Sequence, residues 1–241
     1  MKISVVIPVL NERGSLPATI AALRACHGLS EIIVADGGST DGTVAWLQAQ
    51  PDIVLVRSIR GKGPQINVGA AVALHVSVAS DICLLFLHAD CLISQPAIDA
   101  LHAALDDPQL AGGAFYVRFA ESRPRSLRLV AWGINIRARF RNSATGDQGI
   151  FVRKSVFESI GGAPEWPLFE DVELVRRIKR AGKFTVLRTP LTVSGRRYIE
   201  HGVLRTALLI YSLRLAYWLG VPPQRLKNWF RDARTDEKSR D

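Results

Sequence analysis

Asp81-Ile82-Cys83-Leu84-Leu85-Phe86-Leu87-His88-Ala89-Asp90-Cys91 is the most informative stretch of this chain. The run from Ile82 to Leu87 is too short for a buried helix and matches a strand covered on both faces. His88 and Asp90 follow at the carboxyl end of this strand, where open α/β sheets bind their ligands. Residues two apart on a strand point to the same side, so we expect both side chains to face one site.

An imidazole beside a carboxylate at a strand end suits a hard divalent cation, Mg²⁺ or Mn²⁺, that carries phosphates. We therefore predict Asp90 as a metal ligand. The alternative is that Asp90 caps the turn or helix that follows it.

Length and composition favour an intracellular α/β protein. A chain of 241 residues with 48% hydrophobic content is enough for one sizeable domain or two small ones. Its three cysteines form no Cys-x-x-Cys pair, which argues against a disulfide framework and against a structural zinc site. The first eight residues, Met1 to Pro8, resemble a first strand and not a signal peptide. We expect a cytoplasmic protein.

The formal net charge of +9 is compatible with nucleic acid, an anionic membrane surface or a phosphorylated substrate as partner. Basic residues are dense over 118–141 and 196–240. These segments contain no helix-turn-helix, zinc-finger or aromatic RNA-binding signature, so nucleic acid is not expected as a partner.

Strands and helices alternate along the first half of the chain. We predict strands over 2–10, 31–35, 53–57 and 82–87, with helices from Ser15 to Gly28 and over 43–49 and 65–79. The later predicted elements are helices over 94–105 and 123–141, strands over 112–119 and 150–153, a short helix closed by Gly161-Gly162, and a helix from Glu170 to Gly182. This order predicts a mostly parallel sheet with helices on both faces.

The glycine-rich segment Asp36-Gly37-Gly38-Ser39-Thr40-Asp41-Gly42 lies between a strand and a helix and predicts a nucleotide-sized pocket. Asp41 precedes the helix and is best explained as its cap. Asp36 ends the strand, so we favour a ligand role for it. The spacing Gly-x-Gly-x-x-Gly is missing here, which argues against a dinucleotide fold.

Two further segments bear charged groups at helix starts. Arg60 and Lys62 stand among glycines before Pro64, where they suit contact with a diphosphate, although solvated loop charges are equally common. Glu170, Asp171 and Glu173 occupy the first turn of a helix, where acids complement the helix dipole. The preceding proline-and-aromatic loop would also suit a carboxylate that takes a proton from a substrate hydroxyl.

Taken in order, these motifs resemble a family 2 glycosyltransferase of the nucleotide-sugar-binding GT-A fold. The matching segments are Val5 to Pro8 with Asn11-Glu12, Ile32 to Gly42, Gly61 to Gly63 with Asn67 and Gly69, Leu85 to Asp90, Gly146 to Phe151, and the pair Glu170-Asp171. The resemblance covers about residues 1–190. The His-Ala-Asp form with Gly-Asp-Gln-Gly is similar to the small bacterial "transferase 2" subgroup.

The resemblance implies a hexosyltransferase-like enzyme that uses a nucleotide-diphosphate sugar, UDP- or GDP-linked, and inverts the anomeric centre. It implies that Asp36 binds the nucleobase, that Asp90 holds Mn²⁺ or Mg²⁺, that Asp171 is the base, and that Glu170 positions the acceptor or its loop. The residues expected at the donor nucleotide are Pro8, Asn11, Glu12, Asp36, Gly38, Lys62, Asn67, His88 and Ala89. Those expected on the acceptor side are Gly146, Asp147, Gln148 and Trp166.

Two positions depart from the family pattern. Gly37 replaces the second Asp of the first loop, and His88 replaces the first acid of Asp-x-Asp. The second departure leaves metal affinity open. A nucleotidyltransferase would want a glycine-rich basic loop after the first strand, which Asn11 to Gly14 hardly supply. A non-catalytic nucleotide-sugar-binding or membrane-associated partner protein is the other alternative, against which Glu170 and Asp171 count.

The C-terminal part differs in character. We divide the chain into a GT-A domain, 1–195, with a nucleotide-sugar half 1–115 and an acceptor half 116–195, and a helical extension with a basic tail, 196–241. The apolar run 203–219 contains Arg205 and Arg214 and is too short to span a membrane. It suits an amphipathic helix at the inner membrane surface, or packing on the domain or in a homodimer. A short helix near Trp229-Phe230 follows, and His201 is either structural or a late metal ligand.

Overall fold

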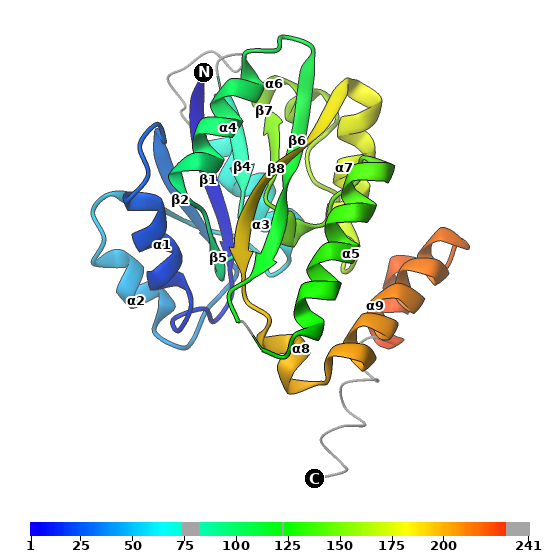
Figure 1. The fold of residues 1–241 in the computed structure, drawn as a ribbon. Helices are drawn as coiled ribbons and strands as arrows, with labels where there is room; N and C mark the ends of the chain where they lie inside the picture. The colour runs from blue at the N-terminus through cyan, green and yellow to red at the C-terminus, as the bar shows by residue number, and fades with distance from the viewer. Residues whose placement is uncertain (74–81, 122, 230–241) are drawn as a thin grey trace.

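A computed structural model of the chain describes residues 1–73, 82–121 and 123–229. One eight-stranded sheet in the order β3-β2-β1-β4-β7-β6-β8-β5 forms its centre (Figure 1). Its strands are β1 (Lys2–Val9), β2 (Glu31–Asp36), β3 (Ile53–Arg57), β4 (Ile82–Phe86), β5 (Cys91–Leu92), β6 (Leu110–Phe119), β7 (Ile150–Arg153) and β8 (Lys183–Val193). The helices are α1 (Leu16–Arg24), α2 (Thr43–Gln48), α3 (Lys62–Val72), α4 (Gln95–Leu105), α5 (Ser126–Arg141), α6 (Lys154–Ser159), α7 (Glu170–Ala181), α8 (Arg196–Glu200) and α9 (Val203–Trp218).

The sheet is mostly parallel, as predicted. β1 pairs in parallel with β2 and with β4, and β2 pairs in parallel with β3. β7 runs antiparallel between β4 and β6, β6 and β8 are parallel, and β5 is antiparallel to β8. The carboxyl ends of β1, β2 and β4 therefore lie at the same end of the sheet. The motifs that contain Asn11, Asp36 and His88 follow these strand ends.

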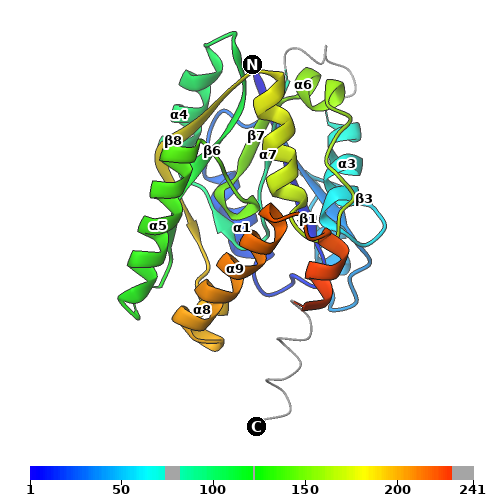
Figure 2. The ribbon, with the colours of Figure 1, turned by 90° about the vertical axis from the view of Figure 1, so that its right-hand side faces the viewer.

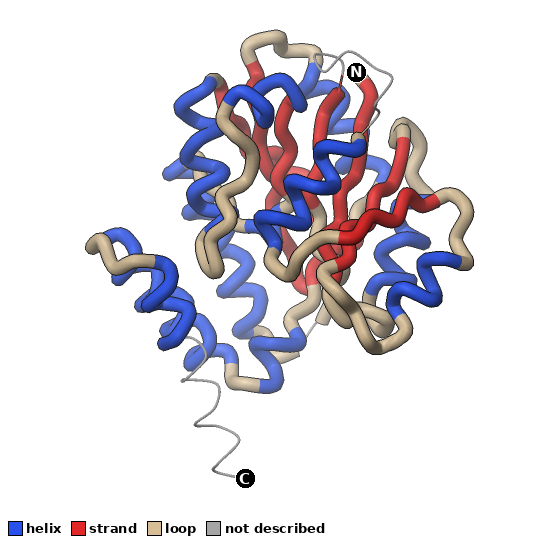
Figure 3. The backbone as a smooth tube through the Cα atoms, turned by 180° about the vertical axis from the view of Figure 1, so that it is seen from behind, coloured by secondary structure: helices blue, strands red, loops and turns tan. Residues whose placement is uncertain are grey.

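Helices cover both faces of the sheet because the central strands are apolar on both sides. Along β1, Ile3, Val5, Ile7 and Val9 contribute to one core with α1, α2 and α4. Val6 points to the other face and packs with residues of α3, α6 and α7. Figure 3 shows the strands enclosed between these helices. The predicted fold class is thus confirmed.

Some boundaries differ from the sequence prediction. α3 begins at Lys62 and not at Gln65, so Gly63 and Pro64 belong to its first turn. The predicted continuation over 74–79 lies outside the described residues. β6 begins at Leu110 and runs across the boundary drawn at residue 115, so the two halves share one strand.

β8, β5 and α8 were not predicted. β8 contains Pro190, which has no N–H for the strand ladder, and its pairing with β6 shifts between Phe115 and Tyr116, next to that proline. This irregularity explains why the strand pattern is weak in the sequence. β5 has two residues, too few for any periodicity to be read.

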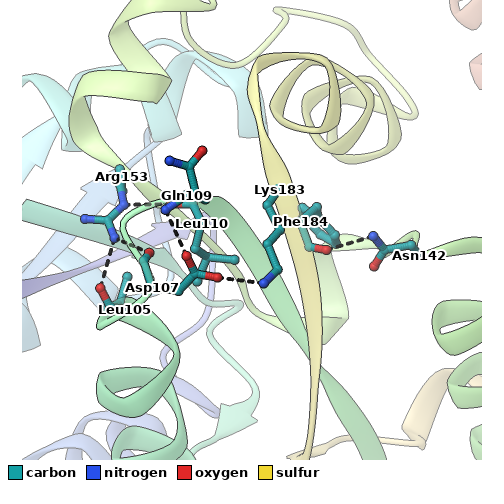
Figure 4. A network of polar contacts seen from close by, with 8 residues as sticks. All are labelled: Leu105, Asp107, Gln109, Leu110, Asn142, Arg153, Lys183 and Phe184. Carbon is teal, nitrogen blue, oxygen red and sulfur yellow. Dashed lines mark hydrogen bonds and ion pairs between the residues drawn. The ribbon is translucent and has the colours of Figure 1, made fainter.

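A polar network fastens the sheet at the edge opposite the site (Figure 4). The Arg153 guanidinium donates to the carbonyl oxygens of Leu105, Asp107 and Leu110, so one side chain joins the end of α4, the start of β6 and β7. Lys183 at the start of β8 forms an ion pair with Asp107, 2.6 Å between Nζ and Oδ2. These contacts hold the ends of β6, β7 and β8 together next to the end of α4.

The last helices lie apart from the layers of the sheet. Figures 1 and 2 show α8 and α9 near the edge at which β1 ends, with α9 beside the lower part of α5. Residues 223–229 form a further helix, whose predicted continuation to Phe230 lies outside the described residues. In the part of the chain that the structure describes, no helix has the length and apolar character needed to cross a membrane.

Candidate active site

Two loops at the ends of β1 and β2 are tied together by hydrogen bonds. Asn11, in the left-handed conformation at φ 57°, accepts a hydrogen bond from the Thr40 N–H through Oδ1, and its own N–H donates to Ser39 Oγ. The Glu12 N–H donates to Thr43 Oγ1. Asp41 accepts the N–H groups of Thr43 and Arg13, so it caps the first turn of α2, as expected.

Asp36 is buried at the end of β2. Its carboxylate accepts hydrogen bonds from the N–H groups of Gly38 and Ser39, and it therefore shapes the glycine-rich loop from inside. Its ligand role stays a prediction.

The substitution of glycine for the usual second acid of this loop has a structural reason. Gln65 of α3 is buried and donates through Nε2 to the carbonyl oxygens of Val9 and Ala35, each at 2.7 Å, which joins the ends of β1 and β2. A Cβ at Gly37 would lie 3.1 Å from the carboxamide of Gln65, tighter than ordinary contact. Gln65 thus fills the space beside Gly37, a role that the sequence did not reveal.

His88, Lys62 and Asp90, which the sequence predicts at the donor and its metal, line one cavity. Lys62 Nζ lies 3.2 Å from His88 Nε2, which joins the start of α3 to the end of β4. Burial, followed by the positive charges of Lys62 and Arg197, holds the pKa of His88 well below its usual value, so the imidazole is neutral and its Nε2 can accept from the ammonium. Asp90 is exposed.

The donor set around Asp90 fits a hard cation that is held chiefly by phosphates. Ligand atoms of His88, Asp90 and Cys91 lie within 4.8 Å of one another. Burial, with the charges of Asp90 and Asp147, raises the pKa of the Cys91 thiol. Its soft sulfur is also a poor match for a hard cation such as Mg²⁺. Asp90 remains as the carboxylate, and Mg²⁺ is commonly bound through one or two carboxylates plus substrate phosphates.

Asp171 is fixed against a short turn, Gly146–Gln148. The Gly146 N–H donates to Asp171 Oδ2 at 2.6 Å. A Cβ at Gly146 would lie 2.7 Å from His88 Nε2 and 3.4 Å from Asp171 Oδ2, so only glycine lets these two groups approach the turn so closely. The carboxylate predicted as base and the histidine predicted at the donor therefore flank one glycine.

Glu170 has an unusual environment for an acid. Its side chain is buried, with 8% exposure. Burial, and then the negative charge of Asp171, raises the pKa of Glu170 to about 7, while Lys62 acts in the opposite direction. A carboxyl group with a pKa near neutrality can hold or release a proton at physiological pH.

A cavity of about 370 Å³ brings most of the charged candidates together. Its wall includes these sequence-predicted residues: Lys62, His88, Asp90, Asp147, Glu170 and Asp171. Pro8 and Gly146 line a small adjoining cavity. Ser39, Thr40 and the other loop residues lie along the same sheet edge but outside the walls of this cavity.

Several predicted site residues make contacts within the protein, and their site roles stay predictions. The Asn67 side-chain amide forms two hydrogen bonds with the Ala163 backbone. Its Nδ2 donates to the Ala163 carbonyl oxygen at 3.0 Å, and its Oδ1 accepts from the Ala163 N–H at 2.8 Å. Gln148 is fully buried, accepts from Arg137 and donates to the Phe115 carbonyl, so it supports the turn and does not line the cavity. The rings of Trp166 and Tyr217 pack against each other with their centroids 6.4 Å apart, and this contact helps to hold α9 in position.

The other wall of the cavity comes from α8 and α9, where sequence reasoning considered only the adjoining His201. The wall includes Arg196, Arg197, Tyr198, Tyr211 and Arg214. His201 also lines the cavity but does not belong to the group of His88, Asp90 and Cys91, and metal ligation by it stays a prediction. The Phe169 ring, 5.1 Å from that of Tyr217, holds α9 against the loop before α7. One signal was present in the sequence: Arg214 interrupts an apolar run, where a charge needs a polar environment.

The chain was compared with models of known protein families. The model of Glycosyl transferase family 2 matches residues 4–161, which is more than half of the chain. The chain belongs to glycosyl transferase family 2. The match includes the loop of Asp36, Lys62, and the stretch from His88 to Asp90, and it ends before Glu170 and Asp171.

Solved glycosyltransferase structures share the fold of this family 2 chain. The match to S. aureus TarS 1-349 in complex with UDP covers 80% of this chain and 60% of that chain, with a TM-score of 0.64 and 16% identity. TarS 1-349 in complex with UDP-GlcNAc gives a TM-score of 0.62 at 17% identity, over 80% of this chain and 58% of that one.

A third structure resembles the chain over more of its length. The mannosyltransferase PcManGT from Pyrobaculum calidifontis, in complex with GDP-Man and Mn2+, has a TM-score of 0.61 and 22% identity, and covers 94% of this chain and 67% of that chain. This family 2 chain thus spans about three fifths of the TarS fragments and two thirds of PcManGT. A search of curated protein sequences gave no match. The predicted family and GT-A fold are confirmed.

Proposed function

We propose that the protein transfers a hexose from a UDP- or GDP-linked sugar to an acceptor hydroxyl, with inversion of the anomeric centre. The observation that carries the proposal is that Asp171, held by the Gly146 N–H, shares a cavity with His88 and Asp90. A base and a phosphate-binding group in one cavity are what a single displacement at a sugar needs.

The acid pair would act on the acceptor. Asp171 would take the proton of the attacking hydroxyl, while Glu170, buried beside it, would position the acceptor or its loop. The support for Asp171 is that it is accessible from the cavity while its Oδ2 is fixed by a backbone donor. We propose residues 1–115 as the donor half and 116–195 as the acceptor half, with β6 common to both.

On the donor side, Asp36 would bind the nucleobase and Lys62 would approach the diphosphate. Asp90 would hold Mn²⁺ or Mg²⁺ together with the donor phosphates, with His88 beside them. When bound, such a cation supplies charge stabilisation for the departing nucleoside diphosphate. The protein's own contribution there is the ammonium of Lys62, oriented by His88 at 3.2 Å.

We also propose that the protein is cytoplasmic and contacts the inner membrane surface through α9. Leu204, Leu208, Leu215 and Leu219 are each at least 61% exposed and recur at helical spacing on the outer side of α9. Arg205 and the exposed arginines of α8 flank this apolar stripe, as expected for a helix lying on anionic lipid. A bacterial origin fits the subgroup that the motifs resemble.

Donor binding tests the proposed function directly. UDP-, GDP- and dTDP-linked sugars are compared for thermal stabilisation, each with and without Mn²⁺ or Mg²⁺. At a hundred times Kd a ligand stabilises a protein by about 2.7 kcal/mol, which is readily measured. We expect one nucleotide class to stabilise the protein, more strongly with metal, and the Asp90→Asn variant to lose the metal-dependent part.

Turnover completes this test. We expect slow release of nucleoside diphosphate from the stabilising donor. Stabilisation without any release, across a panel of acceptors, would favour the non-catalytic nucleotide-sugar-binding alternative. Release of pyrophosphate would indicate a nucleotidyltransferase. No stabilisation by any donor, in a protein shown to be folded, would contradict the proposal.

A further inference from the structure

Two arginines from distant parts of the sequence line the same cavity. Arg137 lies near the end of α5 and Arg214 lies on α9, the helix beside it in Figures 1 and 2. Arg214 is 9% exposed, and no residue in the described part of the chain forms a hydrogen bond or ion pair with it. A guanidinium that is buried in this way normally has an anionic partner.

Arg137 is fixed in place and still has an unused donor. Its Nη2 donates to Gln148 Oε1 at 3.0 Å and to Thr145 Oγ1 at 3.4 Å. Its Nε is buried and has no hydrogen-bond partner among the described residues. The side chain is thus oriented by the turn after α5 and lines the cavity with one buried donor unpaired.

The two guanidinium groups influence each other. Burial, and then the positive charge of Arg137, lowers the pKa of Arg214 to about 10, and the carboxylates of Asp171 and Asp147 act in the opposite direction. Two like charges close together in a partly desolvated cavity destabilise the protein unless an anion binds between them. The arrangement is therefore built for a ligand that carries negative charge.

The position of the pair distinguishes it from the donor diphosphate site. The charges that act on His88 are those of Lys62 and Arg197, and neither Arg137 nor Arg214 is among them. Arg137 is attached to the turn of residues 145–148, and the Gly146 N–H of that same turn binds Asp171. The pair is thus coupled to the carboxylate that would deprotonate the acceptor.

We propose that Arg137 and Arg214 form a subsite for an anionic group of the acceptor, a phosphate or carboxylate, which places the acceptor hydroxyl at Asp171. This proposal rests on the proposed function. The anionic group can belong to a soluble phosphomonoester or to the phosphate of a lipid at the membrane surface, and the chemistry that recognises it is the same in both.

The first measurement uses inorganic phosphate as the probe. Its binding to the full chain is followed by thermal shift with excess nucleoside diphosphate present to fill the donor site, for the wild type, Arg214→Gln and Arg205→Gln. Arg205 is exposed on the same helix and does not line the cavity, so it is the matched control. We expect Arg214→Gln to weaken phosphate binding by at least about tenfold and Arg205→Gln to leave it unchanged.

Two further readouts separate this subsite from the donor site. Without phosphate, we expect Arg214→Gln to melt at a higher temperature than the wild type, because it removes an unpaired buried charge. Stabilisation by the nucleotide sugar should be the same in Arg214→Gln and wild type. Equal phosphate affinity in both proteins overturns the subsite, and loss of the nucleotide-sugar effect in Arg214→Gln reassigns Arg214 to the donor.

Acceptor pairs then identify the source of the anion. Transfer to soluble phosphomonoesters that carry a further free hydroxyl is compared with transfer to the corresponding dephosphorylated alcohols. Transfer to a phospholipid in vesicles whose headgroup carries a free hydroxyl is compared with transfer to a neutral lipid that carries the same hydroxyl. We expect a phosphorylated member to be preferred and Arg214→Gln to raise its KM. Efficient transfer to uncharged acceptors that is insensitive to Arg214→Gln overturns the subsite while leaving the glycosyltransferase intact.

Discussion

Glu170 and Asp171 are adjacent in the sequence and differ in what surrounds them. Asp171 has a backbone donor at 2.6 Å from Oδ2, whereas Glu170 is buried beside it. The difference supports the separate roles proposed above, since a base must be fixed and reachable by the acceptor, whereas a buried acid with a raised pKa can position the loop in its neutral form.

Replacing Asp171 with Asn tests this assignment. We expect turnover of the stabilising donor to fall by about 10²-fold or more, with donor binding retained, since general bases contribute about 10²- to 10⁴-fold. Glu170→Gln is the matched variant and should lose less, because the amide preserves the shape of the neutral acid. The rates come from nucleoside diphosphate release. A larger loss in Glu170→Gln than in Asp171→Asn would make Glu170 the base.

The pKa of Glu170 predicts how stability depends on pH. Between the ordinary value of 4.5 and about 7, the folded protein binds a proton that the unfolded chain has released. The free energy of unfolding therefore falls as pH rises through this interval and stays lower above it. Glu170→Gln should remove this fall and stabilise the protein at pH 8 by about 1 to 3 kcal/mol, measured by urea unfolding at pH 5 and pH 8.

Glu173 provides a control of opposite sign for this measurement. Burial disfavours its charge, but hydrogen bonds from Arg176 and Arg177 outweigh burial and hold its pKa below the usual value. Glu173→Gln should therefore destabilise the protein at pH 8. If Glu170→Gln also destabilised it at pH 8, the charge of Glu170 would be favourable in the fold and the pH argument would be wrong.

At the scale of elements, the close contact of β6 with its two neighbours sets the shape of the sheet. Gly113 is opposite Phe151 of β7 and Thr185 of β8. A Cβ at Gly113 would lie 2.3 Å from the Thr185 carbonyl oxygen and 2.4 Å from the Phe151 ring. The Thr185 oxygen belongs to the backbone, so β6 and β8 themselves would have to move apart to make room for the Cβ.

We expect Gly113→Ala to destabilise the protein by about 1 to 3 kcal/mol, the usual effect of overpacking. Gly14→Ala is the control, because no atom lies within 4 Å of a Cβ placed there. The measurement is equilibrium unfolding in urea. Equal stability of the two variants would mean that β6 can separate from β8 without loss, contrary to the packing described here.

The sequence predicted the elements whose pattern is local. The apolar run at Ile82 to Leu87 and the strands before it predicted the parallel half of the sheet. The motifs predicted site roles for His88, Asp90 and Asp171, and these three residues line one cavity. β8 was missed because Pro190 interrupts it and its pairing shifts there. Gln65 was missed because its role depends on two carbonyl oxygens of other strands, Val9 and Ala35, which no local pattern reveals.

At the scale of the molecule, α9 has an apolar outer side as well as an inner side that lines the cavity. The sequence indicated a helix over 203–219 but not that one of its sides completes a site more than 100 residues away from Lys62. The inner side of α9 already packs against the domain. A second, exposed apolar patch on its outer side therefore indicates a further contact surface.

The double variant Leu208→Glu, Leu215→Glu tests the membrane as the occupant of this patch. We expect wild-type protein to sediment with vesicles containing anionic lipid and the variant to bind at least about tenfold more weakly, since each leucine contributes roughly 1.5 to 3 kcal/mol of apolar burial. Val54→Glu, on the edge strand β3, should bind as the wild type does. Unchanged binding of the double variant, or a dimer that the variant dissociates, would assign the patch to another partner.

The cavity that lies between the sheet edge and α9 also has an evolutionary consequence. One wall comes from residues 62–90, and the facing wall includes residues of α9, which follows the family-matched segment 4–161. Under the proposed function, substitutions in α9 would change which acceptor is accepted without altering Lys62, His88 or Asp90. Acceptor preference would then diverge among descendants of one ancestral enzyme while donor preference is inherited, and grafting α9 between relatives would exchange acceptor preference and leave donor preference unchanged.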